Sequence, residues 1–87
     1  MSDPLFANLA ARFRSRALAD GDRLRAALAA SDRATVGAIA HALSGSAGTF
    51  GFAAISSHAA ALELAVEAGD DRLDGAAEPL LAALDLI

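Results

Sequence analysis

Apolar residues recur at helical spacing along this 87-residue chain, and no stretch shows the apolar–polar alternation of a half-buried strand. This periodicity restricts the chain to an all-α fold. The length allows one domain, residues 1–87, with a small hydrophobic core and a marginal net stability. Amphipathic helices with short connections in a chain of this size predict an antiparallel four-helix bundle.

Capping and breaking residues predict where these helices begin and end. Asp3 followed by Pro4 is typical of an N-cap and a first helical position. The apolar stripe of the first segment is disturbed near Asp20 and Gly21, so we expect an additional or interrupted helix at the N-terminus. The later boundaries are expected after Asp32, near Gly51, at Gly69 and near Gly75.

The composition excludes several classes of protein. Without cysteine there is no disulfide framework and no thiolate metal site. A net charge of -4 argues against a nucleic-acid partner, and no apolar run approaches the roughly 20 residues of a membrane span. The start MSDPLF lacks the basic region and apolar core of a signal peptide, so we expect a cytoplasmic protein.

The charge is distributed unevenly between the two halves of the chain. Residues 1–41 hold six arginines and four aspartates, about +2, whereas residues 42–87 hold Arg72 and seven acids, about -6. A basic face on the first helices could steer an acidic partner. The alternative is an ordinary solvated helix surface.

His41 stands out on the second expected helix, because it lies well round from the apolar stripe, on the solvent side. Gly37, Gly45 and Gly48 surround it at i-4, i+4 and i+7. Each glycine inside a helix costs roughly 1 kcal/mol relative to alanine, so three of them require a reason. Access is one: a large group must approach the imidazole closely. The alternative is a histidine without function beside glycines that end the helix.

The second histidine, His58, lies on the flank of the third apolar stripe, where a packing or surface role is expected. A two-histidine metal site with His41 lacks carboxylates at supporting spacing, so we expect no metal. Phe50 and Phe52 are interpreted as core residues that close the end of the second helix; the alternative for Phe52, which projects towards the His41 side, is contact with a partner.

The stretch from His41 to Gly51, HALSGSAGTFG, resembles the signature of the histidine-containing phosphotransfer (HPt) domain family. In that signature His, a variable residue, an apolar residue and usually Lys precede Gly and a small residue, with another Gly shortly after. The flanking segments that end at Ser31-Asp32 and span residues 59–63 extend the similarity to about residues 12–67.

This resemblance implies that His41 is the phosphorylated residue and that Gly45 gives room for the partner's active site. The implied partner is the receiver domain of a response regulator, of a hybrid histidine kinase, or of both. The candidate site comprises His41 and the surrounding positions Gly37, Ser44, Gly45, Ser46 and Gly48.

One departure from the family pattern concerns position 44, where Ser44 replaces the usual lysine in a chain that has no lysine at all. The cation that would attract the phosphoryl group is therefore missing. We expect slower transfer unless an arginine of the first segment substitutes for it.

The sequence contains no nucleotide-binding loop, so we expect a phosphocarrier without autonomous kinase activity and without a cofactor. Neutral imidazole has a lone pair that can attack an aspartyl phosphate. The main alternative is a non-catalytic helical adaptor that binds a kinase or receiver without relaying phosphate. An acyl carrier ranks lower, because Ser44 and Ser46 lack the Asp-Ser-Leu context of such proteins.

Overall fold

The computed structural model describes residues 4–87, which form four α-helices and no strand. The helices are α1 (Pro4–Ala29), α2 (Arg33–Thr49), α3 (Ala53–Glu67) and α4 (Asp74–Asp85). The prediction of an all-α fold is confirmed, whereas the predicted N-cap Asp3 lies outside the described residues. None of these helices is long and apolar enough to cross a membrane.

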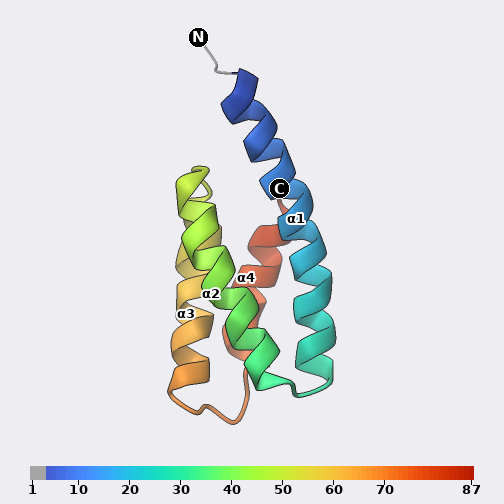
Figure 1. Ribbon diagram of the computed structural model, residues 1–87. Helices are drawn as coiled ribbons and strands as arrows, with labels where there is room; N and C mark the ends of the chain where they lie inside the picture. Colours follow the sequence, from blue (N-terminus) through green and yellow to red (C-terminus); the bar gives the residue numbers. More distant parts are fainter. Residues whose placement is uncertain (1–3) are drawn as a thin grey trace.

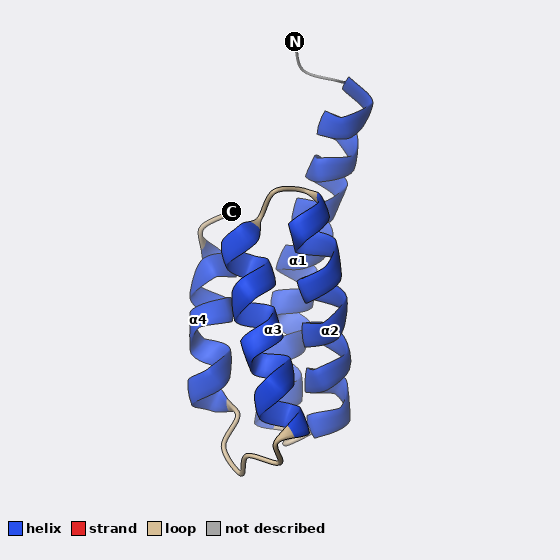
Figure 2. Ribbon diagram, turned by 90° about the vertical axis from the view of Figure 1, so that its left-hand side faces the viewer, coloured by secondary structure: helices blue, strands red, loops and turns tan. Residues whose placement is uncertain are grey.

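The four helices form an elongated bundle of 47 × 20 × 19 Å. Successive helices are joined at alternating ends, with the α2–α3 turn at one end and the other two connections at the opposite end (Figures 1 and 2). Around the bundle, α1 contacts α2 and α4, and α3 contacts the same two helices. The first turns of α1 project beyond the other helices (Figure 1).

The core lies along the bundle axis and is built from one apolar stripe on each helix. Most alanines on these stripes are fully buried and let the backbones approach closely, while larger aliphatic side chains fill the space between them. The largest fully buried side chains are Leu24, Leu43, Ile55, Leu62, Leu80, Leu84 and Val36.

An aromatic cluster closes the end of the bundle at the α2–α3 turn. Phe13 of α1 stacks on Phe50 and Phe52, with ring centroids 5.4 and 5.2 Å apart. Phe6 lies against Phe50 at 5.8 Å. The interpretation of Phe50 and Phe52 as core residues is confirmed in part, since both pack against the core but remain half-buried.

The expectation of an additional or interrupted N-terminal helix is wrong, because α1 continues without a break through Asp20 and Gly21. Asp20 is only 9% exposed, but its carboxylate accepts a hydrogen bond from Arg23 one turn later, at 2.9 Å. Gly21 faces α4, where an added Cβ would lie 3.4 Å from Leu84. The contact of Gly21 with Leu84 and the hydrogen bond of Asp20 with Arg23 thus explain the disturbed apolar stripe without a helix break.

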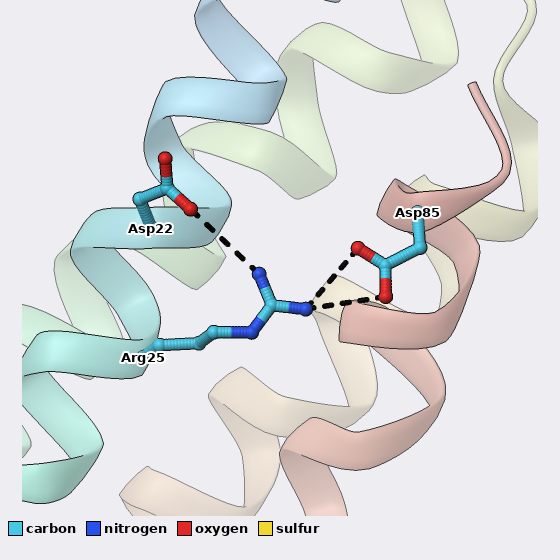
Figure 3. A network of polar contacts seen from close by, with 3 residues as sticks. All are labelled: Asp22, Arg25 and Asp85. Carbon is cyan, nitrogen blue, oxygen red and sulfur yellow. Dashed lines mark hydrogen bonds and ion pairs between the residues drawn. The ribbon is translucent and has the colours of Figure 1, made fainter.

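Polar contacts hold α1 against α4 at the surface. Arg25 of α1 donates to both carboxylate oxygens of Asp85 at 3.1 and 3.2 Å, and it lies 3.9 Å from Asp22 (Figure 3). Such exposed pairs contribute about 0–1 kcal/mol each, so they orient the two helices more than they stabilise them.

The ends of α2 and α3 are satisfied by side chains and turns. Asp32 caps α2 by accepting hydrogen bonds from the backbone N–H and the hydroxyl of Thr35. These bonds, the hydroxyl first, hold the pKa of the Asp32 carboxyl below its ordinary value of 3.8. Arg33 donates to the carbonyl oxygens of Val66 and Asp70 at the end of α3.

The boundaries expected near Gly51, at Gly69 and near Gly75 lie close to these positions. Gly51 and Gly69 follow α2 and α3 with φ of 84° and 76°, in the left-handed region that favours glycine. The last helix, α4, begins at Asp74 and accommodates Pro79 inside it.

Candidate functional site

His41 lies on the exposed side of α2, and its side chain is 77% exposed. The buried stripe of this helix faces the core between α1 and α3, and the helical period carries residue 41 out of that stripe. The buried residues are Val36, Ile39, Ala40, Leu43 and Ala47. The imidazole is thus presented to solvent by a helix that is anchored on its opposite side.

Glu63 of α3 contacts this imidazole: its Oε2 lies 2.6 Å from His41 Nδ1. A carboxylate can accept a hydrogen bond but cannot donate one, so this contact requires the ring hydrogen on Nδ1. In the neutral ring the lone pair then lies on Nε2, the nitrogen farther from Glu63. The pair therefore fixes both the orientation of the ring and the nitrogen that can act as a nucleophile.

Sequence reasoning did not find Glu63 as a partner of His41. The two residues are 22 positions apart on different helices, so no spacing rule connects them. The one signal was that Glu63 ends the segment 59–63, which resembles the region flanking the family signature.

The glycines around His41 have different surroundings. At Gly45 an added Cβ would meet nothing within 4 Å, so the turn after the histidine is open. At Gly48 it would be in ordinary contact with Ser56, 3.5 Å from the hydroxyl oxygen.

Gly37 differs from the other two glycines in having a close neighbour on α3. An added Cβ there would lie 3.2 Å from Val66 Cγ1, closer than an ordinary contact. Gly37 therefore allows α2 and α3 to pack closely, which is a second reason for a small residue at this position.

The serine hydroxyls near the histidine point back to the backbone. Ser44 donates to the carbonyl oxygen of His41 at 2.9 Å, and Ser46 donates to that of Ala42 at 2.8 Å. Ser56 of α3 donates to the carbonyl oxygen of Ser44 at 2.6 Å and so links the two helices. Neither serine of α2 directs its hydroxyl toward the imidazole.

His58 is half-buried on α3, and residues 4–87 contain no cluster of three or more His, Asp or Glu side chains that could hold a metal ion. The chemistry of the site therefore rests on one oriented imidazole, one carboxylate and the open surface beside Gly45.

Comparison with known proteins gave one match. The family model described as Hpt domain matches residues 8–87 of the chain. Neither the curated proteins nor the solved structures gave a match.

Proposed function

The chain belongs to the Hpt domain family, which implies a phosphotransfer role in two-component signalling, and from that premise we propose that His41 carries a phosphoryl group between receiver domains. The observation that carries this proposal is the hydrogen bond between His41 Nδ1 and Glu63. It leaves Nε2 as an exposed nucleophile beside the open surface of Gly45.

In the proposed step, the Nε2 lone pair attacks the phosphorus of an aspartyl phosphate on a receiver domain. The new N–P bond forms as the bond between phosphorus and the aspartyl oxygen breaks, and the aspartate leaves as a carboxylate. The ring keeps its hydrogen on Nδ1 and becomes cationic. The Glu63 carboxylate stabilises that positive charge, and the reverse sequence delivers the phosphoryl group to a second receiver.

The receiver would supply the metal ion and the acidic pocket, since this chain offers only the nucleophile and its orienting carboxylate. The proposal describes a phosphocarrier that does not phosphorylate itself from ATP, acting in the cytoplasm as a single domain of residues 1–87. We also propose that the four helices are antiparallel, because successive helices are joined at alternating ends of the bundle.

The test is labelling by a panel of receiver domains that carry radioactive phosphate. Acid-labile, base-stable label is expected on the unaltered protein. His41→Gln should carry no such label, and its helical circular dichroism spectrum should be unchanged. His58→Gln is the matched control and should label normally. Labelling of His41→Gln together with loss of label in His58→Gln would contradict the assignment.

One specific observation favours a second function, that of a non-catalytic adaptor. Ser44 stands where the family usually has a lysine, and its hydroxyl is bonded to the His41 carbonyl. An adaptor would bind receiver domains and remain unlabelled by all of them.

A further inference from the structure

Most of the seven arginines in this chain are already engaged within the bundle. Arg23 is bonded to Asp20, and Arg25 to Asp85. Arg33 binds carbonyl oxygens at the end of α3. Arg14 lies over the Phe52 ring, 5.9 Å from its centroid.

Three arginines have no such partner within residues 4–87: Arg12, Arg16 and Arg72. Arg12 and Arg16 are exposed and one turn apart on α1, in a stretch from residue 4 to residue 19 that contains no acid. Like charges at this spacing repel each other, and the nearest acid on α1, Asp20, is one turn from Arg16 but is bonded to Arg23 instead.

The flank of α1 that bears Arg12 and Arg16 lies on the side of α2. The opposite flank faces α4, because Gly21 is close to Leu84 and Arg25 is bonded to Asp85. Arg12 and Arg16 share their flank with Asp20, at i-8 and i-4 from it. Since α1 contacts only α2 and α4 among the described helices, this flank borders the exposed face of α2.

The stacking of Phe13 on Phe50 sets the level of these arginines along the bundle. His41 lies roughly 13 Å from Phe50 along the α2 axis, at about 1.5 Å per residue. Arg12 lies near the level of Phe50, and Arg16 is one turn closer to His41. A protein interface of about 800 Å² per partner corresponds to a disc of roughly 16 Å radius, and packed helices lie about 8–10 Å apart. A partner centred on His41 therefore covers Arg16 and extends about as far as Arg12.

We propose that Arg12 and Arg16 form the electrostatic docking site for the acidic rim of a receiver domain, in the role that the missing lysine at position 44 would otherwise have. This inference rests on the proposed function. Two unpaired cations next to the nucleophile's face attract a partner whose active site is acidic, and they act over a screening length of about 10 Å at 0.1 M salt. Two cations are too few for a nucleic-acid backbone in a chain of net charge -4.

The test compares the unaltered protein with a set of variants in phosphotransfer from one labelled receiver at about 50 mM and about 500 mM salt. Arg12→Glu combined with Arg16→Glu is expected to slow transfer at least tenfold at low salt and to remove most of the salt dependence. Arg72→Glu, an equal change at an unpaired arginine outside this flank, should leave rate and salt dependence unchanged. Adding Ser44→Lys to Arg12→Ala/Arg16→Ala should restore much of the lost rate.

The affinity for the unphosphorylated receiver, measured by calorimetric titration, separates this inference from the proposed function. If the unaltered protein never labels, the proposed function fails, and the titration still tests docking. Unchanged affinity and salt dependence in the doubly substituted protein would overturn the docking site, as would an equal loss in Arg72→Glu.

Phe6 and Leu9 are exposed next to these arginines, so binding to vesicles of anionic lipid is measured as well. Loss of vesicle binding with unchanged receiver affinity would assign the arginines to a membrane surface instead.

Discussion

The turn before His41 and the turn after it each contain a glycine four residues away, yet their surroundings are opposite. Gly37 lies against Val66 of α3, where an added Cβ would be only 3.2 Å from Cγ1, while an added Cβ at Gly45 would meet nothing within 4 Å. One glycine therefore serves the packing of two helices, and the other leaves a surface open. The same residue type at symmetrical spacing can thus have two unrelated causes.

The largest expected effect comes from placing the same side chain on both turns. Gly45→Leu should reduce phosphotransfer about 100-fold, equivalent to roughly 2.7 kcal/mol, because the side chain occupies the partner's path. Its stability should rise by up to about 1 kcal/mol, since leucine is the better helix former. Transfer kinetics from a labelled receiver and thermal unfolding measure the two quantities.

Gly37→Leu is the matched control on the closed turn. Overpacking against Val66 should lower the free energy of unfolding by roughly 1–2 kcal/mol, or by several degrees in Tm. Transfer per folded molecule should stay within a few-fold of the unaltered rate. A stable Gly37→Leu protein that fails to transfer, beside an active Gly45→Leu protein, would reverse the comparison.

A smaller effect is expected at Glu63, which orients the histidine between the two turns. Glu63→Gln keeps an oxygen that can accept from Nδ1 but removes the charge, so transfer should fall about tenfold, or roughly 1.4 kcal/mol. In Glu63→Ala the transfer rate should fall further, and His41 should no longer adopt a single ring tautomer. NMR of the ring nitrogens measures the tautomer. If Glu63→Ala keeps both the tautomer and the rate, Glu63 does not position the nucleophile.

The smallest effect concerns the N-terminal end of α2, on the closed side of the comparison. The hydrogen bonds from Thr35 lower the pKa of Asp32 in the folded state, so its stabilising contribution is present above the ordinary value of 3.8. That contribution is lost as the pH falls through the lowered pKa. The Tm of the unaltered protein should therefore decrease more than that of Asp32→Asn between about pH 6 and pH 2. Parallel Tm profiles would show that this cap does not titrate, and transfer at neutral pH should be equal in both proteins.

The sequence allowed the helices and the exposure of His41 to be predicted, because both follow from local periodicity and capping. The helix break at Asp20 was predicted wrongly. An aspartate near the apolar stripe indicates an interruption of the helix, unless a partner such as Arg23 allows its carboxylate to be buried. Contacts between helices could not be predicted, because they join residues that are far apart in the sequence. Neither the pairing of Glu63 with His41 nor the neighbour of Gly37 leaves a trace in spacing along one helix.

The hydrogen bond from Ser56 to the Ser44 carbonyl links α3 to α2 one turn from the histidine. Sliding one helix along the other by a single residue would break this bond and move the Glu63 carboxylate about 1.5 Å relative to Nδ1. The reactivity of the imidazole therefore depends on the axial register between α2 and α3. A partner that pushes on α3 could slow or speed the transfer without touching His41, and the NMR signal of the ring would record that push.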